Sequence, residues 1–301
     1  MKQFDSNDTP LANELADNTQ RLARAGEARV VKPANTRIFT ISNQKGGVGK
    51  TTTAVNLAAA LAIKGLKVLV IDLDPQGNAS TALGVDHHHG VQGTYDVLTD
   101  DVSNASVIRQ SSTIANLYCL PATINLAGAE MELFSNFSDE SIRYRLRSKL
   151  ADYLSSVSSA DRPDYIFIDC PPSLGLLTVN AFVAAREVLI PIQCEYYALE
   201  GLSQLLDTVK LIKSALNPEL KVSTILLTMF DSRTRLATQV ADEVRSHFGN
   251  ETLQAVIPRA VRVSEAPSFG QTIMTYDKSS SGAIAYLEAA IEMANKGAHN
   301  G

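Results

Sequence analysis

Apolar runs alternate with longer helical segments along most of the chain. Near-continuous stretches of Val, Ile and Leu predict strands that are buried on both faces, at residues 37–42, 67–72, 165–169, 187–192 and 222–228. Helical segments lie between and after them, at residues 50–64, 141–155, 176–185, 199–216, 236–248 and near 282–295. This order predicts an α/β fold, a mostly parallel twisted sheet flanked by helices, in one domain over residues 37–296.

The two ends of the chain lack this pattern. Residues 1–36 are polar and Ala-rich, so we interpret them as a flexible N-terminal extension. Leu11, Leu15 and Leu22 fall at positions that could share one side of a short helix, which leaves a partner-binding helix open as the alternative. Residues 297–301 are predicted to be a C-terminal tail.

Composition excludes several classes of protein. The chain has 301 residues, 45% of them hydrophobic, which is enough for a core and excludes disordered and collagen-like proteins. Its three cysteines form no CxxC pair, and this favours a reducing, cytoplasmic setting. The longest apolar stretch, residues 54–63, is interrupted by Asn56, so neither a membrane span nor secretion is expected. Because the formal net charge is −5, any binding of nucleic acid depends on a local basic patch.

A glycine-rich segment joins the first predicted strand to the first predicted helix. It reads SNQKGGVGKTTT over residues 42–53. In this setting small residues let backbone N–H groups point at a phosphate, and the start of the helix adds positive charge. Lys50 is expected to reach the β- and γ-phosphates of a nucleotide, and the Thr51 hydroxyl to ligate Mg²⁺. The predicted nucleotide-binding residues of this loop are Lys45, Gly46, Gly47, Val48, Gly49, Lys50, Thr51 and Thr52.

This segment departs from the usual phosphate-loop pattern. Gln44 stands where GxxxxGK[ST] has glycine, and a second lysine, Lys45, precedes Gly46. The sequence KGGVGKTT resembles the deviant Walker A box of the ParA/MinD/NifH group of P-loop NTPases. The resemblance implies that Lys45 reaches across a homodimer interface to the partner's nucleotide, so that two ATP molecules lie between two subunits. A cation supplied in this way would couple dimerisation to the γ-phosphate.

Three carboxylates stand at or just after the ends of predicted strands. Asp72 and Asp74, in VIDLDPQGN, are two positions apart and leave the same side of an extended segment. Asp74 matches the aspartate of the DxDPQGN switch in the resembling group, so it is the candidate to hold a water molecule of Mg²⁺ or to orient the attacking water. Asp72 is interpreted as a buried residue that positions the loop. Asp169 ends the segment YIFID in a Walker B form and is expected to accept hydrogen bonds from the Mg²⁺ water shell and from Thr51.

No feature of the sequence indicates a covalent intermediate. Cys170 is interpreted as a small buried apolar residue. Residues 87–89 are adjacent histidines near glycines, which we interpret as a solvated loop, with a metal site as the weaker alternative. The expected reaction is attack of water on the γ-phosphate. The predicted catalytic residues are Lys45, Lys50 and Asp74, and the predicted metal site consists of Thr51, Asp74 and Asp169.

Further motifs narrow the resemblance. Residues 74–78, 120–130, 169–177, 191–205 and 263–270 are similar to the chromosomal ParA, or Soj, type of partitioning ATPase. The similarity implies a weak ATPase whose ATP-bound homodimer binds double-stranded DNA of the nucleoid without sequence preference. A ParB-type centromere-binding protein would stimulate hydrolysis and release.

The same resemblance implies residues for DNA and for the base. Arg233 and Arg262 match basic positions implicated in DNA binding, and Arg235, Arg245 and Lys278 are weaker candidates. Pro258, in the segment 256–260, would lie against the adenine, and Ala260 stands where relatives often have Asn. The implied ligands are therefore ATP, Mg²⁺ and duplex DNA.

Related proteins with other functions fit the sequence less well. Residues 282–301 contain Glu288 and Glu292 against only Lys296, whereas MinD-like proteins bind anionic lipid through a basic amphipathic helix; no membrane partner is expected. The cysteine spacings do not supply the paired form of an iron–sulfur protein of this fold. A related ATPase that positions a non-chromosomal cargo, or that acts as a regulatory switch, is the alternative function.

Overall fold

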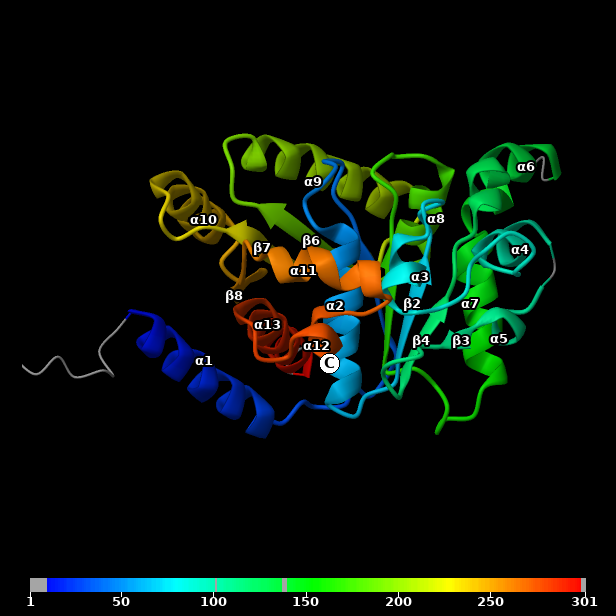
Figure 1. Ribbon diagram of the computed structural model, residues 1–301. Helices are drawn as coiled ribbons and strands as arrows, with labels where there is room; N and C mark the ends of the chain where they lie inside the picture. Colours follow the sequence, from blue (N-terminus) through cyan, green and yellow to red (C-terminus); the bar gives the residue numbers. More distant parts are fainter. Residues whose placement is uncertain (1–9, 101, 137–139, 299–301) are drawn as a thin grey trace, which may run out of the picture.

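The computed structural model describes residues 10–100, 102–136 and 140–298, and one sheet of eight strands forms its centre (Figure 1). The strands are β1 (Arg37–Ile41), β2 (Val68–Asp72), β3 (Arg109–Gln110), β4 (Leu117–Leu120), β5 (Tyr165–Asp169), β6 (Glu187–Gln193), β7 (Lys221–Phe230) and β8 (Thr252–Pro258). They lie in the order β3-β4-β2-β5-β1-β6-β7-β8, and all neighbouring pairs are parallel except β3 with β4. The predicted α/β fold with a mostly parallel sheet is confirmed.

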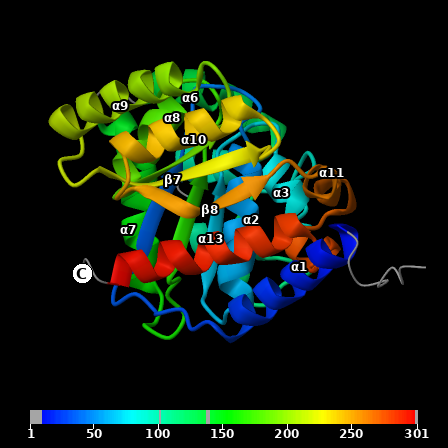
Figure 2. The same cartoon turned by 90° about the vertical axis from the view of Figure 1, so that its left-hand side faces the viewer.

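Helices cover both faces of this sheet because alternate strand residues point to opposite sides. In β2, Val68 and Val70 belong to one apolar cluster and Leu69 and Ile71 to the other. The first cluster includes α2 (Lys50–Ile63), α3 (Asn78–Ala82), α12 (Ile273–Tyr276) and α13 (Ser281–Ala298). The second includes α7 (Arg145–Ser156), α8 (Leu176–Ala184), α9 (Ala198–Ala215) and α10 (Arg235–His247). Figure 2 shows α2 and α13 on one side of β7 and β8, with α9 and α10 on the other.

The five predicted strands and six predicted helices are all present, but three strands have no counterpart in the prediction. Strand β3 consists of two exposed residues, β4 is only four residues long, and β8 is interrupted by the exposed Gln254, so none forms a long apolar run. The helix predicted for residues 141–155 is divided into two elements. The shorter elements are α4 (Thr94–Thr99), α5 (Asn104–Val107), α6 (Ala129–Asn136), α11 (Val261–Glu265), η1 (Ile124–Gly128), η2 (Glu140–Arg143) and η3 (Ala266–Phe269). Among the described residues, no helix has the length and apolar character needed to cross a membrane.

The chain before β1 contains a docked helix. Residues Pro10–Glu27 form α1, which contacts α13 (Figures 1 and 2). Leu22 and Ala25 pack on the first apolar cluster, whereas Leu15 is exposed. A flexible extension was predicted for residues 1–36, whereas residues 10–27 form a docked helix. Composition does not reveal the surface on which such a helix docks. Residues 1–9 and 299–301 lie outside the described residues, and α13 continues through Ala298, into the predicted tail.

Polar contacts hold α1 to the domain. Arg21 forms a two-point ion pair with Glu288 on α13, with N···O distances of 3.0 and 2.6 Å. The Lys64 ammonium group at the end of α2 donates hydrogen bonds to the backbone carbonyls of Gly26 and Ala28, at 2.7 and 2.9 Å. These contacts satisfy carbonyl groups at the end of α1 that have no partner within the helix.

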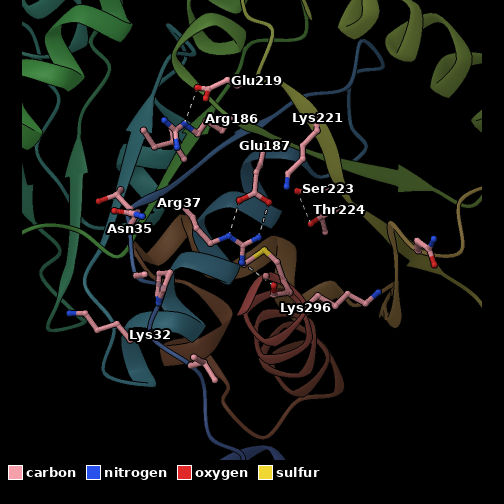
Figure 3. A pocket seen from close by; sticks show the side chains of 18 residues that line it. Lys32, Asn35, Arg37, Arg186, Glu187, Glu219, Lys221, Ser223, Thr224 and Lys296 are labelled. Atoms are coloured by element: carbon pink, nitrogen blue, oxygen red, sulfur yellow. Dashed lines mark hydrogen bonds and ion pairs between the residues drawn. The ribbon is translucent and has the colours of Figure 1, made fainter. Parts of the chain in front are cut away.

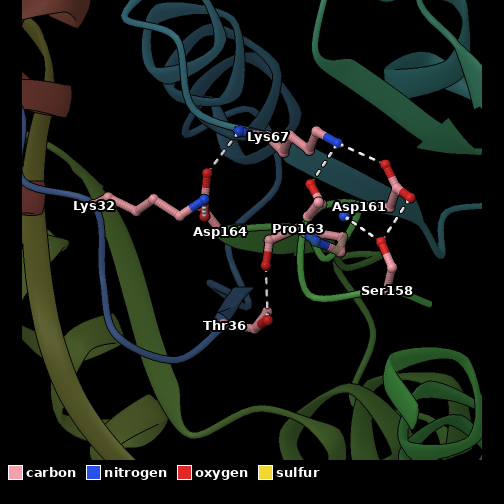
Figure 4. A network of polar contacts seen from close by, with 8 residues as sticks. Lys32, Thr36, Lys67, Ser158, Asp161, Pro163 and Asp164 are labelled. Atoms are coloured by element: carbon pink, nitrogen blue, oxygen red, sulfur yellow. Dashed lines mark hydrogen bonds and ion pairs between the residues drawn. The ribbon is translucent and has the colours of Figure 1, made fainter. Parts of the chain in front are cut away.

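A second set of contacts ties the following segment to the amino end of the sheet (Figure 4). Lys32 pairs with Asp164 at 3.0 Å, and the same buried carboxylate accepts a hydrogen bond from the backbone N–H of Lys67 at 2.8 Å. The Thr36 hydroxyl donates to the carbonyl of Pro163 at 2.7 Å. The buried Asp164 carboxylate needs such partners, and its pairing with Lys32 holds residues 32–36 against the sheet before β1.

Breaking the Arg21–Glu288 pair is expected to lower the free energy of unfolding. Both side chains are 31% exposed and meet in two-point geometry, so Arg21→Ala should destabilise the protein by about 1 kcal/mol. Denaturant unfolding of Arg21→Ala, Glu288→Gln and the double variant measures the coupling. The control is Lys210→Ala, which breaks the well-exposed pair with Asp207 and should change little. Additive effects of the two substitutions would contradict the assigned ion pair.

Candidate functional site

The candidate site lies at the edge of the sheet where β1, β2 and β5 end. Parallel strands end at the same edge, where ligands of open α/β sheets bind. In the sheet register, Asp169 lies beside Ile41 of β1 and beside Asp72 of β2. The glycine-rich loop, the DPQGN segment and the turn after YIFID therefore meet at this edge.

The glycine-rich loop has the backbone shape and the open space that a phosphate requires. Gly47 and Gly49 have φ angles of 75° and 86°, in the left-handed region that favours glycine, and Gly49 immediately precedes α2. A Cβ atom built at Gly46 or Gly47 would meet no atom within 4 Å, so the space before the loop is open. The loop thus directs the N-terminal end of a 14-residue helix toward open space.

Hydrogen bonds from neighbouring strands fix this loop. The Asn43 amide donates to the carbonyl of Pro191 at 2.9 Å, and its oxygen accepts from the Lys45 backbone N–H at 3.0 Å. The Thr228 hydroxyl, on β7, donates to the carbonyl of Val48 at 2.9 Å. Sequence reasoning missed Asn43 and Thr228, because the contacts with Pro191 and Val48 join segments that are distant in the chain.

Lys50 is buried at the start of α2 and points back over the loop. Its ammonium group donates to the carbonyl of Lys45 at 3.2 Å. Burial lowers the pKa of Lys50, and the nearby carboxylates of Asp169 and Asp74 oppose that change. Thr51 and Thr52 follow in the first helical turn and are half-buried. Lys50 thus lies between the loop backbone and the two carboxylates, where it can meet a phosphate.

The second lysine of the motif has a different environment. Lys45 is 40% exposed and forms an ion pair with Glu195, which follows β6. Sequence reasoning missed Glu195, although it lies within a motif that was recognised. In a single chain, the lysine implied to serve a partner subunit is held by a carboxylate of its own chain.

Asp169 is fully buried beside this loop. Neither carboxylate oxygen accepts a hydrogen bond within the described part of the chain. Burial raises the pKa of Asp169 well above its usual range, and Asp72 raises it further. The Thr51 side chain lies close enough to oppose this rise, without meeting the geometry of a full hydrogen bond. A buried carboxylate with free oxygens beside a Thr hydroxyl fits the water shell of Mg²⁺.

Asp72 and Asp74 have separate structural roles. One Asp72 oxygen accepts from the backbone N–H and hydroxyl of Ser80, at 2.8 and 2.7 Å, and the other from the backbone N–H of Asp74 at 3.2 Å. Burial raises the pKa of Asp72 to about 6. These contacts are those of a residue that positions the loop. Asp74 is half-buried, and one of its oxygens accepts from the backbone N–H of Gln76 at 3.0 Å, which leaves the other available.

The predicted DNA and base residues lie at or after the ends of β7 and β8, outside the phosphate loop. Arg233 is 86% exposed and Arg262 is 61% exposed. Pro258 ends β8 and is half-buried. Arg245 instead donates to the carbonyl of Gln254 at 3.2 Å and has its Nε buried, so it is poorly placed for a phosphate.

Other candidate chemistry in the sequence is not assembled into a site. Cys170 is buried with its sulfur 3.1 Å from the Thr40 hydroxyl, and burial raises its pKa to about 12. His87 meets the Thr81 hydroxyl at 2.9 Å, while His88 and His89 are exposed. Within the described residues, no group of three or more His, Cys, Asp or Glu side chains could hold a metal ion. A Mg²⁺ ion here would take Thr51, phosphate oxygens and water as direct ligands, with Asp169 and Asp74 acting through that water.

A cavity of about 880 Å³ lies at the amino end of the sheet, away from this loop (Figure 3). Its wall includes Arg37 and Glu187, whose two hydrogen bonds are each 2.7 Å long. The Arg37 guanidinium also lies 4.7 Å from the centre of the Phe39 ring. These charges satisfy each other, and no predicted site residue lines the cavity, so it is separate from the candidate site.

The open loop, the helix that follows it and the buried carboxylate define a P-loop site on an α/β sheet. Comparisons with known proteins agree with this class. Residues 36–222 match a family described as "AAA domain". The sporulation initiation inhibitor protein Soj of Bacillus subtilis is 51% identical over 261 residues, which cover 87% of this chain and 99% of that protein. The chromosome partitioning protein ParA of Myxococcus xanthus is 50% identical over 258 residues, covering 85% of this chain and 87% of that protein.

Solved structures share this fold. Cobyrinic acid a,c-diamide synthase from Mycobacterium smegmatis, with bound ATP analog and magnesium, is 36% identical, with a TM-score of 0.70 over 85% of this chain and 93% of that chain. The septum site-determining protein MinD from Pyrococcus horikoshii, complexed with Mg-ADP, is 26% identical, with a TM-score of 0.65 over 85% of this chain and 95% of that chain. The chain belongs to the Soj/ParA family of chromosome-partitioning ATPases.

Proposed function

We propose that this protein is an ATP-hydrolysing switch for chromosome partitioning. It binds ATP with Mg²⁺, forms a homodimer, and binds nucleoid DNA without sequence preference until a ParB-type protein stimulates hydrolysis. The observation that carries this proposal is the open glycine-rich loop with Lys50 beside the buried, unpartnered carboxylate of Asp169. Support also comes from the relatives named Soj and ParA and from solved relatives that contain an ATP analog or ADP.

The loop residues have distinct roles toward the nucleotide. The backbone N–H groups from Gly46 to Thr52 and the N-terminal end of α2 bind the phosphates, and Lys50 neutralises charge on the β- and γ-phosphates. The Thr51 hydroxyl and Asp169 would hold Mg²⁺ and its water shell, and Asp74 would contact the same water. When bound, this ion would stabilise negative charge on the transferred phosphoryl group.

Hydrolysis needs a positioned water rather than a protein nucleophile. Asp74 has one oxygen held by the Gln76 backbone and the other available for that water. No second protein base is proposed, so the intrinsic rate should be low and open to stimulation by a partner.

Lys45 connects the nucleotide to dimerisation. ATP shifts a monomer–dimer equilibrium only if it binds the dimer more tightly, and a lysine that meets the partner's γ-phosphate supplies that difference. The contact with Glu195 is the competing state of Lys45 in the monomer.

Removing the charge of Glu195 is expected to favour the dimer. In Glu195→Gln, Lys45 no longer has to break an ion pair before it contacts the partner's γ-phosphate. Half-maximal dimerisation should therefore need roughly threefold less ATP. Light scattering during an ATP titration measures this midpoint. Glu200→Gln, which removes an exposed charge from the first turn of α9, is the control. An unchanged or higher midpoint in Glu195→Gln would rule out the restraint.

DNA binding is assigned to the loops after β7 and β8. Arg233 and Arg262 are exposed there, and β7 also carries Thr228, which holds the phosphate loop. One strand therefore connects the nucleotide site with the DNA surface. Two subunits double the number of arginines that meet phosphate, which explains why the dimer would bind and the monomer release. Pro258 is proposed to lie against the adenine.

Duplex binding by the wild type and Lys50→Ala, with ATP, ADP and no nucleotide, tests this function. Wild type with ATP should bind DNA of unrelated sequences with similar affinity, and binding should fall steeply with salt. Lys50→Ala should not respond to ATP. Failure of the ATP-loaded wild type to show salt-sensitive binding, or equal binding in all three nucleotide conditions, would overturn the proposal.

A further inference from the structure

Three arginines follow the ends of β7 and β8, and two of them pair with carboxylates. Arg233 follows β7, Arg259 follows β8 directly, and Arg262 lies on α11. All three are exposed, so the loops present basic groups to solvent. Asp231 follows β7 beside Arg233, and Asp277 follows α12 beside Arg262.

Asp231 holds Arg233 in a two-point ion pair. Its oxygens accept from Nε and Nη2 of the guanidinium, both at 2.8 Å, and Oδ1 also accepts from the Arg233 backbone N–H at 3.1 Å. Arg233 lowers the pKa of Asp231 to about 2, and Arg259 contributes to the same shift. Asp231 is therefore anionic at neutral pH, and the donor edge of Arg233 is turned toward its own loop.

Asp277 stands in the same relation to Arg262. The Nε atom of Arg262 lies 3.3 Å from Oδ2 of Asp277, at the end of α12. The other oxygen accepts from the Ser279 hydroxyl at 3.1 Å, which fixes the carboxylate. Arg233 is thus paired with an acid of its own loop, and Arg262 with an acid at the end of α12.

We propose that Asp231 and Asp277 are counter-charges that restrain Arg233 and Arg262 and set the affinity of the ATP-bound dimer for duplex DNA. The inference rests on the proposed DNA-binding function. A phosphate must displace the carboxylate from each arginine, and each carboxylate then repels the phosphate that replaces it. Binding therefore stays weak enough for each subunit to leave the DNA once the dimer separates. A cyclic switch requires this release.

Conversion of each acid to its amide separates charge from structure. The side-chain amide oxygen in Asp231→Asn can still accept the Arg233 backbone N–H, and that in Asp277→Asn can still accept the Ser279 hydroxyl, so both turns are retained. Each substitution should raise duplex affinity at least about threefold, the effect of one unit charge a few ångströms from a phosphate in water. If the freed arginine gains a phosphate contact, the salt dependence of log affinity steepens by about 0.9 per contact.

The experiment measures duplex binding with ATP and Mg²⁺ over a salt series for wild type, Asp231→Asn, Asp277→Asn and Asp207→Asn. Asp207→Asn makes the same change in net charge on α9, where Asp207 pairs with Lys210, so it controls for general electrostatics. Asp231→Asn is also placed in an Arg233→Gln background, where its gain should largely vanish. Light scattering with ATP checks that dimerisation is unchanged.

The outcomes separate this inference from the function on which it rests. Higher affinity in the two amide variants, absent from Asp207→Asn, supports the counter-charge role. Normal wild-type binding with unchanged or weaker binding by Asp231→Asn and Asp277→Asn overturns the inference alone. Absence of duplex binding by the whole series overturns both the inference and the proposed function.

Discussion

Lys45→Ala is expected to bind nucleotide normally and to remain monomeric in ATP and Mg²⁺. Lys50 and the backbone of the glycine-rich loop, which make the contacts within one subunit, are untouched by the substitution. Nucleotide affinity measured by fluorescence should therefore change by less than about threefold. The dimer should fall below detection at concentrations where the wild type is dimeric, because the γ-phosphate loses the cation that distinguishes dimer from monomer.

The matched control for Lys45→Ala is Lys50→Ala. That substitution should weaken nucleotide binding itself, because Lys50 is the buried lysine beside Asp169 and Asp74. The two lysines are thus assigned separable roles. An ATP-dependent dimer retained in Lys45→Ala would remove the basis for a lysine supplied in trans.

Asp74→Asn is expected to block hydrolysis while ATP binding and dimerisation persist. The amide oxygen can still accept the Gln76 backbone N–H, so the turn should fold normally. The oxygen available for the attacking water is replaced by an NH2 group, which cannot accept a hydrogen bond from that water. Steady-state hydrolysis should fall by about a hundredfold or more. Phosphate release measures the rate, and light scattering should show a dimer that persists after ATP is added.

The control for Asp74→Asn is Asp86→Asn, an exposed carboxylate of the loop after α3. It should hydrolyse ATP at the wild-type rate. Hydrolysis by Asp74→Asn within about threefold of the wild type would exclude Asp74 as the residue that positions the water.

The sequence identified the parts of this site that are contiguous in the chain. The loop containing Lys50 is recognisable because each glycine and the lysine must occupy fixed positions relative to the following helix. Asp169 was found for a related reason, since an apolar strand that ends in an acid brings that acid to the carboxyl edge of the sheet. The structure places both at the same edge, in adjacent strands or loops.

Side-chain contacts between segments that are distant in the chain could not be predicted from the sequence. Glu195 reaches Lys45 only because β6 lies beside β1, and Asp277 reaches Arg262 only through the turn after α12. The docking of α1 likewise depends on Glu288 of α13, more than 260 positions later in the chain. Exposed polar residues carry no hydrophobic period, so their partners become visible only once the fold is known.

The central claim is that ATP and Mg²⁺ join two copies of this chain. The most direct measurement is the molar mass in solution of the same sample with Mg²⁺ and either a non-hydrolysable ATP analogue or ADP. We predict twice the monomer mass with the ATP analogue, the monomer mass with ADP, and the monomer mass for Lys45→Ala with both. A wild type that stays monomeric with saturating analogue and Mg²⁺ would contradict the account.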